Sequence, residues 1–251
     1  MSILRPLRGL DNNLYENLES SFTQAYPKFE IIFSVAQPND QAVSIVRALQ
    51  DKYPDVDSRL IIGEDVAVVN PKIQNLMKSY KAAKYDILWI ADSNALNGPN
   101  SLANAIPLFD TVTPRNRKPV GMVHHVPFAI FPDLSWGARV EQAFLCTTHA
   151  KMYLAINKTE IDSCIMGKST FVRKSDLDRT TAGAKVMAER EGATALQGYG
   201  DYLGEDNMIG HALWHQLGLG HAMNSDVVGN SVGRMTLRTY FWRRVRWIRV
   251  R

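Results

Sequence analysis

The sequence has few cysteines, no long apolar run and no region of low complexity. Its two cysteines, Cys146 and Cys164, are too few for a disulfide framework, so we expect a reducing compartment and small buried side chains at both positions. No stretch approaches the roughly 20 apolar residues that cross a bilayer, and the N-terminus lacks the apolar core of a signal peptide. As given, the sequence predicts a soluble or peripheral protein.

What is present fits one domain of enzyme size. The 251 residues are 45% hydrophobic, which is enough to bury a substantial core without division into two. We find no internal repeat. The sequence begins inside a strand-like segment at residues 2–7 and stops inside an arginine-rich helix, so we expect both ends to continue in a longer protein.

The first half alternates strand and helix signals. Apolar runs that predict strands lie at residues 3–5, 30–35, 59–62 and 87–91. Apolar side chains at helical spacing lie between them, marked by Leu14, Leu18 and Phe22, by Val43, Val46 and Leu49 after Asp40, and by a helix over residues 71–83 that begins with proline. Four strands joined by three helices predict an α/β fold with a mostly parallel, doubly wound sheet.

The second half is less regular. Residues 120–123 and 165–172 predict strands, and residues 136–156 predict one long helix. Residues 176–204 are polar and contain glycine, and we interpret them as a loop beside the functional site. Such loops often close over a substrate.

Three aspartates stand at the ends of these elements. Asp40 and Asp92 follow predicted parallel strands, where ligands bind in open α/β sheets. Asp206 begins a helical pattern, where the helix dipole tolerates a carboxylate. Each has an ordinary structural reading as well: a helix N-cap for Asp40, a turn for Asp92, and dipole complementation for the pair Glu205 and Asp206.

Basic charge gathers at the C-terminal end. Residues 234–251 hold seven arginines and no acid, so the rest of a chain of net charge +4 carries −3. An apolar stripe with helical spacing runs among these arginines, formed by Leu237, Phe241, Val245 and Ile248. This pattern is typical of a helix on a membrane surface. No nucleic-acid-binding motif accompanies it, so we do not expect nucleic acid as a partner.

Several longer segments carry a resemblance. They lie at residues 4–9, 53–57, 70–76, 85–93 and 140–142, and read LRPLRG, YPDVD, NPKIQNL, YDILWIADS and VEQ. Through them nearly the whole chain resembles ceramide glucosyltransferases, a membrane-bound family of inverting glycosyltransferases with a GT-A fold.

The resemblance implies an activity and a place in the cell. It implies transfer of glucose from UDP-glucose to the primary hydroxyl of ceramide at the cytosolic face of Golgi or ER membranes, by a protein with membrane segments beyond this chain. It also implies one GT-A domain, with a nucleotide-binding half at residues 1–110 and an acceptor half at residues 111–251.

The resemblance also implies site residues. The three aspartates of the family's active site match Asp40, Asp92 and Asp206, and its R-x-x-R-W motif matches Arg243, Arg246 and Trp247. A functionally sensitive histidine and cysteine of the family match His149 and Cys164. Asn94 stands where a full D-x-D motif has its second acid.

Glycosyl transfer needs a base, neutralisation of the departing diphosphate and recognition of the nucleobase. Asp206 is our candidate base. Asp92 suits Mg²⁺ or Mn²⁺, with the Asn94 oxygen as a weaker ligand, and Asp40 suits the uracil or ribose. Lys72 is a candidate donor contact, although a lysine on a helix face is more often solvated.

The C-terminal motif has two readings. Arg243 and Arg246 suit the diphosphate because guanidinium groups bind it with a planar fork, and Trp247 suits the sugar or acceptor. The alternative is a basic amphipathic helix with Trp247 in the core. His149 is either a donor or product contact or a satisfied structural group.

His211 and His215 are four residues apart, as in zinc proteases. The segment lacks the glutamate of that motif, and we interpret both histidines as structural.

Two other functions stay open. A processive polysaccharide synthase pairs three acids with a similar basic motif. A non-catalytic membrane-surface protein that binds a UDP-sugar is the second alternative, because the second D-x-D acid is missing.

Overall fold

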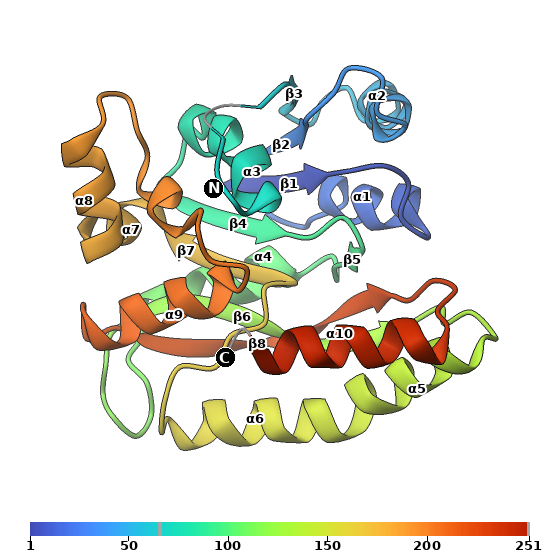
Figure 1. Cartoon of the computed structure of the whole chain (residues 1–251). Coiled ribbons are helices and arrows are strands. Elements are labelled where there is room, and N and C mark those ends of the chain that lie inside the picture. The colour runs from blue at the N-terminus through green and yellow to red at the C-terminus, as the bar shows by residue number, and fades with distance from the viewer. Residues whose placement is uncertain (65–66, 250–251) are drawn as a thin grey trace.

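The computed structural model describes residues 1–64 and 67–249. One mixed sheet crosses the molecule, with helices on both faces (Figure 1). Its strand order is β3-β2-β1-β4-β7-β6-β8-β5. The strands are β1 (Ser2–Leu7), β2 (Glu30–Val35), β3 (Ser58–Ile62), β4 (Ile87–Ala91), β5 (Ala95–Leu96), β6 (Val120–Ile130), β7 (Ser169–Arg173) and β8 (Gly220–Ser231).

The first four strands form the predicted parallel sheet. Strand β1 pairs in parallel with β2 and β4, and β2 with β3, so the strand order reverses direction at β1. The connecting helices are α1 (Leu14–Phe22), α2 (Ala42–Lys52) and α3 (Pro71–Ala82). Ile3 and Leu7 pack into the cluster that holds α1 and α2, whereas Leu4 packs into the cluster that holds α3. The two faces of β1 thus bury helices on opposite sides, as period-two alternation requires.

The start of α3 is fixed by local chemistry. The Asn70 side chain accepts hydrogen bonds from the backbone amides of Lys72, at 2.9 Å, and Ile73, at 3.4 Å. Pro71 occupies the first turn, where its missing N–H costs nothing. This cap holds Lys72 at the N-terminal end of α3, which is the end near the carboxyl ends of the strands.

The second half of the sheet is mixed. Strand β7 is antiparallel to both β4 and β6, β6 is parallel to β8, and β5 is antiparallel to β8. The parallel prediction therefore holds for β1 to β4 and for one further pair. Strand β8 was not predicted, because its middle, Asn224 to Asp226, is polar. Strand β7 begins at Ser169, four residues after the predicted start.

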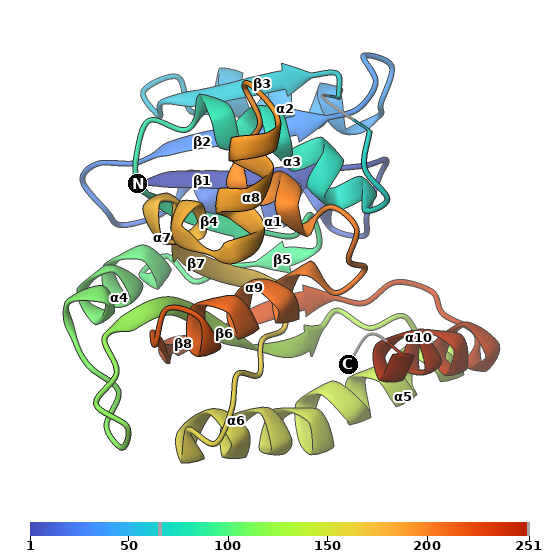
Figure 2. The same cartoon turned by 60° about the vertical axis from the view of Figure 1, so that its left-hand side comes forward.

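The loop predicted over residues 176–204 is wrong. This segment holds most of α7 (Lys174–Arg179), all of α8 (Thr181–Glu189) and the 3₁₀ helix η3 (Ala195–Tyr199), and it packs over α3 and α9 (Figure 2). Leu177, Leu196 and Tyr199 are fully buried. The Thr180 hydroxyl joins two of the helices, since it accepts hydrogen bonds from the Gly183 amide and the Tyr199 hydroxyl. The polar composition belongs to the exposed faces of short helices.

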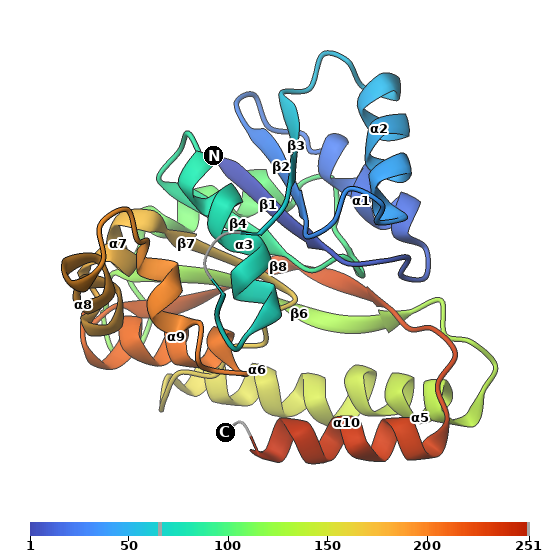
Figure 3. The same cartoon turned by 45° about the horizontal axis from the view of Figure 1, so that its top comes forward.

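The long helix predicted over residues 136–156 is confirmed as a continuous helical stretch. It consists of α5 (Trp136–Phe144), a π-helical turn η2 (Leu145–His149) and α6 (Ala150–Thr159). Helix α10 (Leu237–Arg249) runs beside α5 (Figure 3). The remaining helices are α4 (Ser101–Ala105), η1 (Ile106–Asp110) and α9 (Glu205–His215). None of the helices in the described ranges combines the length and apolar character needed to cross a membrane.

Candidate active site

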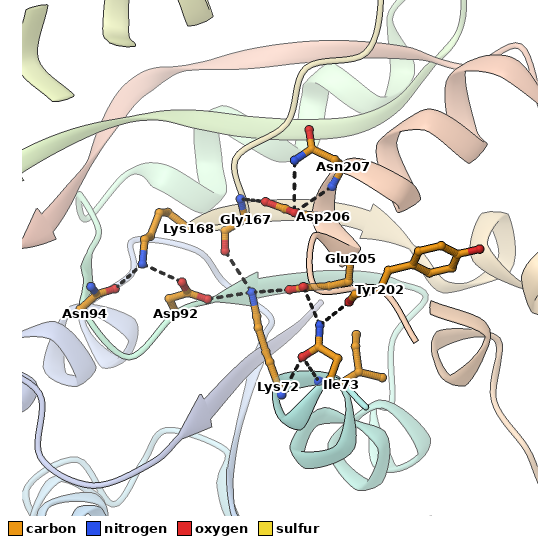
Figure 4. Close-up of polar contacts among 11 residues, drawn as sticks. Lys72, Ile73, Asp92, Asn94, Gly167, Lys168, Tyr202, Glu205, Asp206 and Asn207 are labelled. Carbon is orange, nitrogen blue, oxygen red and sulfur yellow. Dashed lines mark hydrogen bonds and ion pairs between the residues drawn. The ribbon is translucent and has the colours of Figure 1, made fainter. Parts of the chain in front are cut away.

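Lys72 lies at the centre of a charged cluster (Figure 4). Its ammonium group is 2.8 Å from Asp92 Oδ1 and 3.0 Å from Glu205 Oε1, and it donates to the carbonyl of Gly167 at 3.2 Å. Lys72 comes from α3, and its partners come from the end of β4, the start of α9 and the segment before β7. Lys72 is therefore a partly buried bridge between acids distant in sequence, and the reading of it as a solvated helix lysine is wrong.

Asp92 has a lysine on each oxygen. Lys168 Nζ donates to Asp92 Oδ2 and to Asn94 Oδ1, both at 2.9 Å, while Lys72 holds Oδ1. Burial opposes ionisation of Asp92, but Lys168 and Lys72 outweigh it and lower the pKa of this carboxyl well below its usual range. Asp92 is consequently an ionised carboxylate at any physiological pH.

Asp206 lies beside the cluster, in the first turn of α9. Its Oδ2 accepts from the amide of Gly167 at 2.5 Å and its Oδ1 from the amide of Asn207 at 2.9 Å. Burial raises the pKa of Asp206, and the neighbouring Glu205 carboxylate raises it further against the opposing charge of Lys72. A carboxyl group with a raised pKa is suited to accept a proton near neutral pH.

Gly167 permits the close approach of Asp206. A Cβ atom at position 167 would lie 2.9 Å from both the Cβ and the Oδ2 of Asp206. A side chain there would push the carboxylate from its place, so the site requires glycine.

A pocket of about 350 Å³ opens next to this cluster. Its wall combines the loop after β1, the end of β8 and parts of α5 and α10, and it is lined by Leu10, Asp11, Asn12, Asn94, Glu141, Asn230, Ser231, Val232, Gly233, Arg234, Met235 and Arg243. Asn94 belongs to both the pocket and the charged cluster. The pocket thus connects the acids to Arg243 of the C-terminal helix.

Arg243 and Arg244 converge on one buried carboxylate. Glu141 of α5 has a side chain that is 1% exposed, and its Oε1 lies 3.2 Å from Arg243 Nε and 3.1 Å from Arg244 Nη2. Arg246 is exposed and does not line this pocket. The structure therefore places Arg243 at the pocket and leaves Arg246 in solvent.

Trp247 belongs to an aromatic group between α10 and the long helix. Its ring lies 5.6 Å from His149 and 6.3 Å from Phe144, and the Arg244 guanidinium stands 3.7 Å above it. His149 also stacks on Tyr153. Trp247 is partly buried against the hydrophobic cluster that contains Cys164. Its contacts therefore agree with the alternative interpretation, in which Trp247 belongs to the core.

Asp40 lies apart from the other acids, at the end of β2. It accepts hydrogen bonds from the amides of Gly9, at 2.9 Å, and Ala42, at 2.8 Å. The second bond is the expected one at a helix start, and the first ties the loop after β1 to α2. A nucleobase contact at Asp40 stays a prediction.

The two histidines with zinc-protease spacing, His211 and His215, contact an acid and each other. His215 Nε2 is 2.8 Å from Asp162 Oδ1, and the rings of His211 and His215 are 4.3 Å apart. Across residues 1–64 and 67–249, no three His, Cys, Asp or Glu side chains are grouped so that they could hold a metal ion.

Comparisons with known proteins identify the family and the fold of the chain. A model described as glycosyl transferase family 21 matches residues 1–251. The chain belongs to this family. A ceramide glucosyltransferase from Komagataella phaffii is 39% identical across the whole chain, and ceramide glucosyltransferase 3 from Caenorhabditis elegans is 30% identical. The family 21 chain spans 56% and 50% of these two relatives.

Solved structures share the GT-A fold with this family 21 chain. The mannosyltransferase PcManGT from Pyrobaculum calidifontis, in complex with GDP-Man and Mn²⁺, has a TM-score of 0.61 at 17% identity, over 99% of this chain and 61% of that one. S. aureus TarS 1–349 with UDP-GlcNAc has a TM-score of 0.52 at 12% identity, over 96% and 60%. The predicted fold class is confirmed.

Several residues of this charged cluster and pocket have no signal in the sequence that marks them. Gly167 and Lys168 both lie inside the predicted strand at residues 165–172, and no sequence pattern marks either of them as a site residue. Glu141 was part of a resembling segment, but nothing in its helix marks it as the partner of two arginines. Only the sheet pairing of β4 with β7 and the packing of α10 on α5 bring these side chains to the site.

Proposed function

We propose that this chain is the catalytic domain of a ceramide glucosyltransferase, which transfers glucose from UDP-glucose to the primary hydroxyl of ceramide with inversion. The observation that carries the proposal is the cluster in which Lys72 joins Asp92 to Glu205, with Asp206 beside them and a polar pocket leading from Asn94 to Arg243. The relatives that share the whole chain are named ceramide glucosyltransferases, which supports the choice of substrates.

The charged side chains have separate roles in the transfer reaction. Asp206, whose carboxyl pKa burial raises, accepts the proton of the acceptor hydroxyl as that oxygen attacks the anomeric carbon. Arg243 at the pocket wall neutralises charge on the leaving diphosphate, and Lys72, which pairs with Asp92, does the same from the charged cluster. Attack opposite the leaving group inverts the anomeric centre. Residues 1–110 supply the nucleotide side and residues 111–251 the acceptor side.

The remaining residues contact the donor or lie on the acceptor side. Asp40 accepts hydrogen bonds from two amides, those of Gly9 and Ala42, and a carboxylate has room for further donors, so it contacts the uracil or ribose without losing either bond. His149 and Trp247 border the acceptor side through the aromatic group they share, and Arg246 acts on the outer surface of α10 rather than on the diphosphate.

The donor set fits a divalent ion. The Asp92 carboxylate and the Asn94 amide oxygen are hard ligands, and a lysine ammonium already lies between them at 2.9 Å from each. Mg²⁺ or Mn²⁺ held by these two side chains would supply positive charge to the diphosphate.

One side of the molecule suits a membrane surface. Helix α10 turns Arg243, Arg244 and Trp247 toward α5 and exposes an opposite apolar face made of Leu237, Phe241, Trp242 and Ile248. Phe131, Leu134 and Trp136 before and at the start of α5 are also exposed, and Gly137 lies against the backbone of Met235 and Thr236. Apolar side chains and arginines together bind the boundary between lipid headgroups and acyl chains.

The experiment is glucose transfer from UDP-glucose to ceramide in lipid vesicles with Mg²⁺ or Mn²⁺, with the unchanged chain and Asp206→Asn. Loss of the base lowers turnover by about a hundredfold or more. UDP-glucose binding stays within about twofold, because the base acts in the transition state. Asp201→Asn, an exposed aspartate five residues earlier, is the matched control and keeps full activity.

Other outcomes would contradict the proposal. If Asp206→Asn abolished donor binding, the assignment of the base would be wrong. Polymer made from UDP-glucose without lipid acceptor would indicate a polysaccharide synthase. UDP-glucose binding without turnover in the unchanged chain would indicate a non-catalytic protein.

A further inference from the structure

The Asp92 and Asn94 oxygens already share one cation. Lys168 Nζ is 2.9 Å from Asp92 Oδ2 and 2.9 Å from Asn94 Oδ1 (Figure 4). The side chain of Lys168 is only 13% exposed. The ammonium group therefore bridges the same two oxygens that the fold offers to a metal ion.

The backbone holds Lys168 in this place. The amide of Asp92 donates to the carbonyl of Lys168 at 3.0 Å, and the amide of Lys168 donates to the carbonyl of Met166 at 2.8 Å. The lysine thus sits in a tight turn that is hydrogen-bonded to the residue whose carboxylate its side chain binds. Little conformational freedom is lost when the ammonium reaches Asp92, so the contact is pre-organised.

A divalent ion and this ammonium compete for one oxygen. Lys72 occupies Asp92 Oδ1, so Oδ2 is the oxygen that a metal shared with Asn94 would take. A charge-assisted hydrogen bond must then be broken before the metal binds. Two protein oxygens are also few for Mg²⁺ or Mn²⁺, which need further oxygen ligands from water or from phosphate.

We propose that Lys168 is a tethered cation that occupies the divalent-ion position of the donor site until the nucleotide arrives. This inference rests on the proposed function only in taking this cluster as the donor site. Without nucleotide, Lys168 keeps Asp92 neutralised and makes metal binding weak. With nucleotide, diphosphate oxygens would complete the ligand set of an ion held by Asp92 and Asn94, this ion would replace the ammonium group, and Lys168 would remain beside the diphosphate as a second positive charge. Lys168 is a positioning residue that couples metal binding to donor binding.

The test measures Mn²⁺ binding to the whole chain without nucleotide, from the electron paramagnetic resonance signal of free Mn²⁺. Lys168→Met keeps the length of the side chain and removes the charge. It binds Mn²⁺ about tenfold more tightly than the unchanged chain, which corresponds to one charge-assisted hydrogen bond that no longer has to be broken. UDP then raises Mn²⁺ affinity less in the variant than in the unchanged chain.

Matched variants separate competition from general charge effects. Lys168→Arg keeps a cation and keeps Mn²⁺ binding weak. Adding Asn94→Ala to Lys168→Met removes the second oxygen and abolishes the gain. Lys168→Gln serves the same purpose if Lys168→Met does not give the circular dichroism spectrum of the folded chain.

Unchanged or weaker Mn²⁺ binding in folded Lys168→Met or Lys168→Gln would overturn the inference. Mn²⁺ binding in Lys168→Arg as tight as in Lys168→Met would overturn it as well. These readouts do not require turnover, so they are independent of the test with ceramide. A chain that makes glucosylceramide but shows no gain in Mn²⁺ affinity refutes the role of Lys168 alone, and a gain without transfer refutes the proposed function alone.

Discussion

Residues 1–110 and 111–251 share one sheet but are built in different ways. The first region contributes parallel strands with helices on alternate faces and contains no histidine. The second adds the antiparallel strand β7, a π-helical turn, all six histidines and most of the exposed apolar side chains. The first region is a regular scaffold, whereas the second carries buried histidines, whose ionisation is opposed by burial, and most of the exposed apolar surface.

The charged cluster lies where the two regions meet. Lys72 and Asp92 come from the first region, and Lys168, Glu205 and Asp206 from the second. Asp92 pairs with Lys72 inside the first region and with Lys168 of the second, and Glu205 of the second region pairs with Lys72 of the first. The site is therefore also an electrostatic link between the two regions, and changes to it test how far the regions depend on each other.

Removal of the Lys72 charge is expected to have the largest effect. Lys72→Met leaves Asp92 and Glu205 buried with one positive partner fewer. Breaking such a buried network costs about 3 kcal/mol of unfolding free energy, at the lower end of the usual range because the lysine is a quarter exposed. Urea unfolding followed by circular dichroism measures this loss.

Lys52→Met is the matched control for this prediction. Lys52 also pairs with a carboxylate, Glu19 Oε1 at 2.6 Å, but its side chain is 52% exposed and both partners lie within the first region. We expect a much smaller cost, because an exposed ion pair contributes little to stability. Equal losses for the two lysines would show that the contact between the regions has no special weight.

Mild acid is expected to weaken the second region first. Burial lowers the pKa of His221 and of His125 to about 4, from an ordinary value of 6.5. Between those values the unfolded chain binds a proton that the folded chain does not, so stability falls as the pH decreases from 6.5 to 4. At pH 5 each histidine accounts for a loss of about 2 kcal/mol relative to neutral pH.

His221→Phe checks the acid prediction. The ring packs 5.3 Å from Trp214, so phenylalanine keeps the shape and removes the titrating group. The difference in unfolding free energy between pH 7 and pH 5 should shrink by about 2 kcal/mol. Hydrogen exchange supplies an internal control, since protection of β6 and β8 amides should fall before that of β1 and β2. Simultaneous loss in all four strands would contradict the comparison.

Sequence patterns predicted the scaffold far better than the second region, and the reason is physical. Leu14, Leu18 and Phe22 lie on one helix face because of local periodicity, and all three are buried. The placement of Asp92 also follows from a local rule, the end of a parallel strand. The helix start at Asp206 follows from a local pattern too. These are features that a window of about a dozen residues contains.

The rest depends on pairings between distant segments. Strand β8 has polar residues in its middle and forms because β6 pairs with it, and Lys168 reaches Asp92 because β7 pairs with β4. Lys72 looks like any helix lysine until Asp92 and Glu205 are placed around it. In such cases tertiary packing overrides local propensity. For the same reason the polar composition of residues 176–204 wrongly predicts a loop.

The smallest expected effect concerns the surface. In residues 1–64 and 67–249 all exposed large apolar side chains except Leu10 and Val69 belong to the second region. If α10 lies on a membrane, the double variant Phe241→Ser and Trp242→Ser binds vesicles about tenfold less tightly, because two apolar side chains no longer leave water. Sedimentation with vesicles measures this, and Val69→Ser, which changes an equally exposed side chain of the first region, leaves binding unchanged. Equal binding by all three proteins would show that the exposed face of α10 does not bind the membrane. The arginines of that helix would then act only at the pocket.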